Sequence, residues 1–133
     1  MSVKKHKVLI IDDEILIREG VKAALQHSNF EALTLESPAR AEAVVRQAKP
    51  DLIIMDLYMP ELNGLELLRK LKKERATAEI PVIIFTGSQE RVDVISGQHA
   101  GAYEYVTKPV DNDVLIDKIR KMLHLKESKS HAR

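Results

Sequence analysis

Short runs of apolar residues alternate with amphipathic segments along most of the chain. The runs at 7–11, 52–55 and 81–85 are almost wholly apolar and rich in branched residues, which predicts buried strands. Runs at 30–35 and 103–106 predict two more strands. A segment with apolar residues at helical spacing follows each run, and these segments are residues 14–27, the stretch from Ser37 or Pro38 to Pro50, the stretch that begins at Asn63-Gly64, residues 89–98, and the stretch that Asp111 caps.

Strands that are separated by helices of ten or more residues must pair in parallel through right-handed crossovers. Because the first, third and fourth strands are apolar on both faces, helices are expected on both sides of the sheet. The pattern therefore predicts an α/β fold, a doubly wound five-stranded parallel sheet in a flavodoxin-like (βα)5 sandwich. The predicted helix at 89–98 has only Val92 and Ile95 on its apolar face and contains Gly97, which indicates a mobile element.

The 133 residues fit one domain, and no repeat or linker marks a second one. We assign residues 1–125 to this domain and residues 126–133 to a polar C-terminal tail, which is expected to be frayed from Leu125. The absence of cysteine excludes disulfides and thiolate metal sites. No apolar run approaches the length of a membrane span, and the N-terminus has no secretory signal pattern, so we expect a cytoplasmic protein without a membrane partner.

The formal net charge of +1 combines an acidic body with basic ends. A basic tail can indicate nucleic-acid binding. The tail has no aromatic residues and the body is acidic, so we interpret the basic residues as a solvated helix face. No direct nucleic-acid binding is expected.

Polar side chains follow four of the predicted strands. Asp12 and Asp13 follow the first strand, Asp56 the third, Thr86 ends the fourth, and Lys108 comes after the fifth. In open α/β sheets, functional groups gather at the carboxyl ends of the strands, near the point where the strand order reverses. Because neighbouring strands lie about 4.8 Å apart, these groups can meet around a small ion.

The residue types then limit the chemistry of this edge. Three carboxylates within a few ångströms repel one another unless a cation lies between them. An all-oxygen ligand set favours Mg²⁺, with Mn²⁺ as a substitute, over zinc. Magnesium held in this way keeps positions open for phosphate oxygens, and Thr86 and Lys108 can bind other phosphate oxygens. Asp56 is then a plausible nucleophile, since aspartate can form an acyl phosphate.

The strand-end residues resemble the functional positions of the response-regulator receiver family, namely Asp12-Asp13, Asp56, Thr86 and Lys108-Pro109. The loop at 56–64 resembles the family's hallmark loop, in which Met-Pro stands three and four positions after the aspartate and Gly stands eight positions after it. The stretch at 100–109 resembles the family's fifth strand and following turn. The resemblance covers about residues 6–124, nearly the whole chain.

The resemblance implies a role for each of these positions. Asp56 would be the phosphoacceptor. Asp13 would bind Mg²⁺ directly, Asp12 mainly through water, and the backbone carbonyl of Tyr58 would be a further ligand beside Asp56. Lys108 would bind the acidic site in the free form and a phosphate oxygen in the phosphorylated form. The bond from Lys108 to the following proline would be cis.

The resemblance also implies a switch and a set of partners. Thr86 and Tyr105 would reorganise the face formed by the fourth helix, fifth strand and fifth helix, so that a downstream protein or effector domain can bind. The phosphoryl donor would be a sensor histidine kinase or a histidine phosphotransfer domain. The side chains of Tyr58 and Ser88 should flank the path of a hydrolytic water, and Tyr103 is expected to be a packing residue. The protein would be a monomer or a weak, phosphorylation-dependent dimer, and not an enzyme beyond self-phosphotransfer and autodephosphorylation at Asp56.

Three other functions are open to a chain of this fold. A pseudo-receiver would be a phosphate-independent interaction module, and it predicts damage to the acidic set or to Lys108, which are both intact. A magnesium phosphatase of the haloacid-dehalogenase pattern needs Asp-x-Asp after the first strand, where this chain has Glu14 at the second aspartate position. A flavin or dinucleotide carrier would need a Gly- or hydroxyl-rich loop there. The sequence leaves open whether the chain stands alone, shuttles phosphate in a relay, or is part of a longer regulator.

Overall fold

The computed structural model describes residues 5–60 and 63–131, with side chains described for residues 5–60 and 63–124. Strands and helices alternate as predicted, and their bounds are β1 Lys7–Ile11, α1 Ile15–His27, β2 Glu31–Leu35, the 3₁₀ helix η1 Pro38–Arg40, α2 Ala41–Ala48, β3 Leu52–Met55, α3 Gly64–Lys73, β4 Val82–Thr86, α4 Arg91–Ala100, β5 Glu104–Thr107 and α5 Asn112–His131. The five strands form one parallel sheet in the order β2-β1-β3-β4-β5. The predicted flavodoxin-like α/β fold is therefore confirmed.

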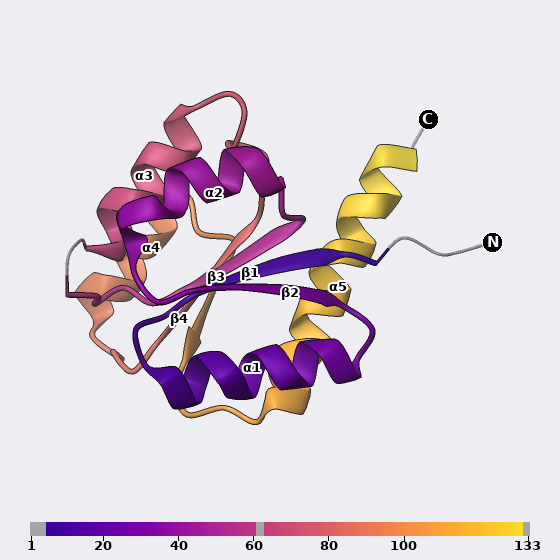
Figure 1. Ribbon diagram of the computed structural model, residues 1–133. Coiled ribbons are helices and arrows are strands. Elements are labelled where there is room, and N and C mark those ends of the chain that lie inside the picture. Colours follow the sequence, from indigo (N-terminus) through magenta and orange to yellow (C-terminus); the bar gives the residue numbers. More distant parts are fainter. Residues whose placement is uncertain (1–4, 61–62, 132–133) are drawn as a thin grey trace.

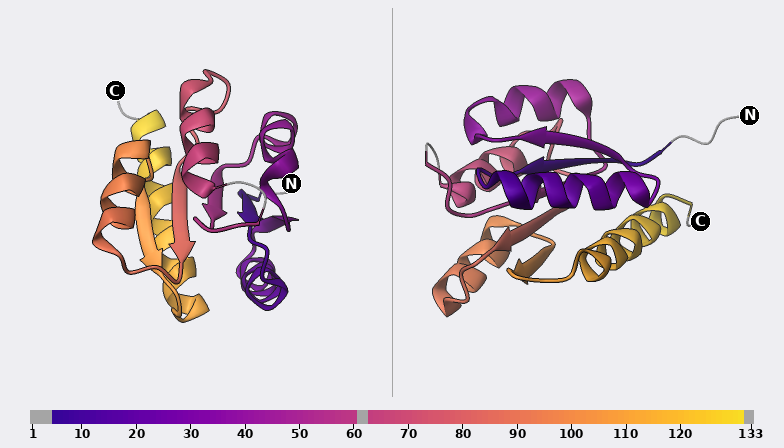
Figure 2. Two further views of the ribbon diagram at one scale, coloured as in Figure 1. Left: turned by 90° about the vertical axis from the view of Figure 1, so that its left-hand side faces the viewer. Right: turned by 60° about the horizontal axis from the view of Figure 1, so that its bottom comes forward.

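Helices cover both faces of this sheet. Figure 1 shows α2 and α3 on one side and α1 on the other, and Figure 2 shows α1 and α5 on the same side of the sheet. Alternate strand residues enter two separate apolar clusters: Val8 and Ile10 pack toward α1 and α5, whereas Leu9 and Ile11 pack toward α2, α3 and α4. This two-sided burial is why the central strands are continuous apolar runs.

The strand order reverses direction between β1 and β3, and this point fixes the position of the site. The register pairs Ile11 with Met55, so Asp12 and Asp56 leave neighbouring strands at the same level. The backbone N–H of Asp56 donates to the carbonyl of Ile11 at 3.2 Å, which continues the pairing one residue beyond the strands. Ligand sites of doubly wound sheets lie at this crevice.

The loop after β3 is folded back onto the end of its own strand. Asn63 accepts a hydrogen bond from the N–H of Leu65 at 2.8 Å and so caps α3, and the N–H of Gly64 donates to the carbonyl of Leu57 at 2.7 Å. A Cβ atom on Gly64 would lie 2.3 Å from the carbonyl oxygen of Asp56. Only glycine therefore permits this close approach of α3 to the backbone of Asp56.

Helix α4 has a polar side chain on its buried face and apolar side chains on its exposed face. Val92 and Ile95 are 66% and 45% exposed, whereas Asp93, Gly97 and Ala100 are buried. The predicted apolar face thus points to solvent, and few apolar anchors hold this helix to the sheet.

Two expectations about the second half of the chain are wrong. Tyr103 was expected to pack, but its side chain is 54% exposed, although its backbone N–H still donates to the carbonyl of Val82 at the start of β4. Helix α5 was expected to fray from Leu125, but it continues to His131, since leucine, lysine and glutamate in this segment favour a helix. The domain boundary after residue 125 stays a prediction. Within the described part of the chain, no helix combines the length and the apolar character needed to cross a membrane.

We predict that Gly64→Ala destabilises the protein by about 1–3 kcal/mol, because the added methyl group meets backbone atoms that cannot move without displacing Asp56. Urea unfolding of both proteins measures the difference. Gly87→Ala is the matched control, since a Cβ there meets nothing within 4 Å, and its effect should stay within about 0.5 kcal/mol. Equal effects of the two substitutions would contradict the steric argument.

Candidate functional site

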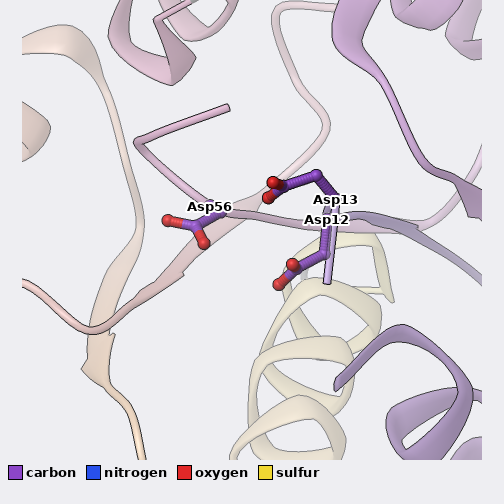
Figure 3. Close-up of side chains that lie close together, drawn as sticks. All are labelled: Asp12, Asp13 and Asp56. Atoms are coloured by element: carbon purple, nitrogen blue, oxygen red, sulfur yellow. The ribbon is translucent and has the colours of Figure 1, made fainter. Parts of the chain in front are cut away.

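Three carboxylates gather where β1 and β3 end. One carboxylate oxygen from each of Asp12, Asp13 and Asp56 lies within 4.8 Å of the others, and Figure 3 shows the three side chains side by side. Asp12 and Asp56 are only 2% and 6% exposed, whereas Asp13 is exposed. The predicted grouping of these acids is therefore found in the structure.

Lys108 reaches this cluster from the turn after β5. Its Nζ donates to Asp12 Oδ2 at 2.9 Å, to Asp56 Oδ2 at 3.0 Å and to Glu14 Oε2 at 2.7 Å. Its backbone N–H donates to the carbonyl of Thr86 at 2.7 Å, which ties the turn to the end of β4. The bond from Lys108 to Pro109 is cis, as the resemblance implied.

The electrostatics of the cluster are dominated by one cation among several anions. Burial works to lower the pKa of Lys108, but its hydrogen bonds to Asp12, Glu14 and Asp56 outweigh burial and raise this pKa. Burial raises the pKa of Asp12, and the hydrogen bond from Lys108 opposes that shift. One ammonium cannot neutralise four carboxylates, so the edge of the sheet retains negative charge that a divalent cation would compensate. The all-oxygen donor set fits Mg²⁺ or Mn²⁺.

Asp12 and Asp13 differ in how the protein holds them. Asp12 Oδ1 accepts a hydrogen bond from the N–H of Glu14 at 2.9 Å, and its other oxygen is bound by Lys108. The Asp13 side chain has no hydrogen bond or ion pair with any described residue. This difference favours direct metal ligation by Asp13 and a water-mediated contact for Asp12, which both stay predictions.

The remaining predicted residues lie around the cluster. Thr86 is 2% exposed at the end of β4, paired with Thr107 of β5. Tyr58 donates its backbone N–H to Asp56 Oδ1 at 3.2 Å. The half-buried ring of Tyr105 packs against the apolar cluster under α4, and its hydroxyl donates to the carbonyl of Ser88 at 2.9 Å. The phosphate, metal and switch roles assigned to these residues stay predictions.

Sequence reasoning missed two residues near the site. Glu14 follows the aspartate pair directly, but its ion pair with Lys108 depends on the turn after β5, which the sequence pattern does not position. Asp93 lies in the first turn of α4, where an acid is normally interpreted as favourable to the helix dipole, although its side chain is buried. The apolar face of this helix is weak, and that weakness was the sequence feature that could have indicated a buried polar residue at Asp93.

A doubly wound sheet with an acid–lysine cluster at its carboxyl edge defines the class of receiver-like α/β proteins. The family model of the response regulator receiver domain matches residues 8–120, and the chain therefore belongs to that family.

Curated relatives share this region. The chain is 39% identical over 116 residues to the phosphate regulon transcriptional regulatory protein PhoB of Pseudomonas aeruginosa, which covers 87% of this chain and 51% of PhoB. It is 38% identical over 117 residues to the protein PilH of the same organism, which covers 88% of this chain and 97% of PilH. The chain thus spans about half of PhoB and nearly all of PilH.

Solved structures are similar over most of the chain. A CheY-like response regulator receiver domain protein from Methanospirillum hungatei JF-1 superposes with a TM-score of 0.89 at 27% identity, covering 95% of this chain and 99% of that one. The chemotaxis response regulator CheY4 of Vibrio cholerae superposes with a TM-score of 0.83 at 27% identity, covering 89% and 98%. Both are single receiver-sized chains covered almost completely by the similarity.

We predict that Mg²⁺ raises the thermal midpoint of the protein and that Asp13→Asn greatly reduces this effect, because it removes an exposed carboxylate of the cluster. At a Mg²⁺ concentration about ten times the dissociation constant, binding adds about 1.4 kcal/mol to the free energy of unfolding. Circular dichroism melts with and without Mg²⁺ measure the shift. Asp117→Asn on α5 is the control and should keep the full shift, whereas an equal loss in both variants would indicate non-specific charge effects.

Proposed function

We propose that this chain is a phosphoacceptor receiver domain of a two-component signal transduction system, which takes a phosphoryl group from a phosphorylated histidine onto Asp56. The observation that carries the proposal is the buried carboxylate of Asp56, which lies 3.0 Å from the ammonium of Lys108 and beside the carboxylates of Asp12 and Asp13. Membership of the receiver family supports it.

The proposed transfer is a single displacement at phosphorus. A carboxylate oxygen of Asp56 attacks the phosphorus of phosphohistidine, and the new O–P bond forms as the N–P bond breaks. The electron pair of the broken bond returns to the imidazole nitrogen, which is then protonated. The product is an acyl phosphate on Asp56, so the chain modifies itself and does not turn over a separate substrate.

Most of the catalysis would be positioning and neutralisation of charge on the transferred group. Bound Mg²⁺ would supply positive charge to the phosphate oxygens. The ammonium of Lys108 and the hydroxyl of Thr86 would bind further phosphate oxygens. The residues proposed to hold the metal are Asp12, Asp13, Asp56 and the backbone carbonyl of Tyr58.

The proposed output is a change of the surface formed by α4, β5 and α5. Thr86 and Tyr105 would transmit the phosphorylation state to this surface, which then binds a downstream protein or effector domain. Exposed apolar side chains support a docking role for it, namely Val92 and Ile95 on α4, Val114 on α5, and Tyr103 just before β5. The proposed donor is a sensor histidine kinase or a histidine phosphotransfer domain in the cytoplasm.

We predict that incubation with Mg²⁺ and acetyl phosphate adds one phosphoryl group, because the donor mimics the reactive phosphate of phosphohistidine. Intact mass measurement detects the adduct, which should be lost in Asp56→Ala and when the metal is chelated. Asp117→Asn, at an exposed carboxylate on α5, is the control and should remain competent. No adduct with acetyl phosphate or with a panel of phosphorylated histidine kinases would favour the phosphate-independent pseudo-receiver.

We predict that Thr86→Ala still accepts a phosphoryl group but no longer transmits it, because the proposed phosphate contact of the hydroxyl is lost. Hydrogen exchange of α4 and β5, with and without phosphorylation, measures transmission. Thr107→Ala is the matched control, since this threonine is paired with Thr86 but belongs to the neighbouring strand. Identical exchange changes in Thr86→Ala and in the parent protein would remove Thr86 from the switch.

A further inference from the structure

Beyond the acid–lysine cluster, one more carboxylate is buried among the described side chains. Asp93, in the first turn of α4, is 9% exposed. Its Oδ2 atom accepts hydrogen bonds from the hydroxyl of Tyr58 at 2.5 Å and from the hydroxyl of Ser88 at 2.6 Å. Within the described residues, no cation forms an ion pair with it. We call Tyr58, Ser88 and Asp93 the tyrosine latch.

The two hydroxyl groups account for the charge state of this carboxylate. The hydrogen bond from Ser88, followed by the one from Tyr58, lowers the pKa of Asp93. The same hydrogen bond raises the pKa of Tyr58 to about 12, so the phenol remains a donor at neutral pH. A buried carboxylate without a cation is costly unless its hydrogen bonds are made, which fixes the positions of both donors.

Hydrogen bonding in the tyrosine latch, and not burial, fixes the ring of Tyr58. Tyr58 is 55% exposed, and an exposed aromatic side chain would otherwise sample several rotamers. The same residue is bound to the phosphoacceptor through its backbone N–H, which donates to Asp56 Oδ1. Asp93 therefore binds the side chain of a residue whose backbone N–H contacts the carboxylate of Asp56.

The latch also connects the loops that follow two neighbouring strands. Tyr58 follows β3 and Ser88 follows β4, which are paired in the sheet. Ser88 is anchored on its other side, because its hydroxyl accepts from the N–H of Glu90 at 3.2 Å and its carbonyl accepts from the hydroxyl of Tyr105. The connection runs from one loop to the other, beside the strand ends that carry Asp56 and Thr86.

We propose that Asp93 is a positioning residue, which holds the ring of Tyr58 between the loops after β3 and β4 and thereby slows hydrolytic loss of the phosphoryl group from Asp56. The inference rests on the proposed function and adds to it a residue of α4. In this loss, a water oxygen attacks phosphorus opposite the Asp56 oxygen, and the O–P bond to Asp56 breaks. The carboxylate is regenerated, and inorganic phosphate leaves with the protons of the water. A ring fixed between the two loops leaves less room for that water than a free ring.

The test compares the lifetime of the phosphoryl group in four proteins: the parent, Tyr58→Phe, Asp93→Asn and the double variant. Each is loaded with acetyl phosphate and Mg²⁺, the donor is removed, and the remaining adduct is followed by intact mass. Each single substitution should speed the loss about three- to tenfold, as expected for a partly solvated hydrogen bond to a charged group. The double variant should lose phosphate no faster than the faster single variant, because both changes remove the same bond.

Glu90→Gln is the matched control. It removes a carboxylate from the same loop, but the side chain of Glu90 makes no hydrogen bond to Tyr58. Its lifetime should equal that of the parent. Thermal midpoints identify any loss of folding in Asp93→Asn, in which case Tyr58→Phe, a change at an exposed ring, decides the question. Parent-like lifetimes in Tyr58→Phe, or single effects that multiply in the double variant, would overturn the role of Asp93. A parent protein that takes no phosphoryl group would overturn the proposed function, and the inference with it.

Discussion

The ammonium group of Lys108 makes the arrangement of acids at this edge of the sheet possible. Two carboxylates that are almost fully buried, Asp12 and Asp56, share it as a common hydrogen-bond donor, and Glu14 adds a third contact from the start of α1. Burial of such groups without a cation would drive one of them to protonate. The ion pairs also join β1, β3 and the turn after β5, so the charge arrangement and the sheet topology depend on each other.

The fold and the main cluster could be predicted from the sequence because both follow from strand ends. Apolar runs fix where each parallel strand stops, and the residue that follows must lie at the carboxyl edge. Asp12, Asp56, Thr86 and Lys108 were located in this way. Contacts between a strand end and a helix of another unit do not follow from this rule. The hydrogen bonds of Asp93 depend on the path of the loop before α4, and the helical continuation after residue 125 depends on local propensity, not on the apolar pattern.

The loop after β3 connects the rigid and the adaptable parts of the molecule. At its end, Gly64 and the cap by Asn63 place the start of α3 directly against the backbone of Asp56, where no additional atom fits. Near its start, Tyr58 reaches α4, an element that few apolar contacts hold in place. Close packing thus fixes the backbone of Asp56, and polar contacts alone connect its loop to α4. Polar contacts of this kind can rearrange without the loss of a packed core.

The reversed polarity of α4 has an evolutionary meaning. A helix that turns Val92 and Ile95 to solvent and keeps the carboxylate of Asp93 inside gives up burial energy that exchanged residues would recover. Selection for stability alone would favour apolar residues inside and the carboxylate outside. Positions that keep a less stable arrangement are typical of functional surfaces. Variation among related chains should therefore be limited at these positions by what the helix does rather than by what keeps it folded.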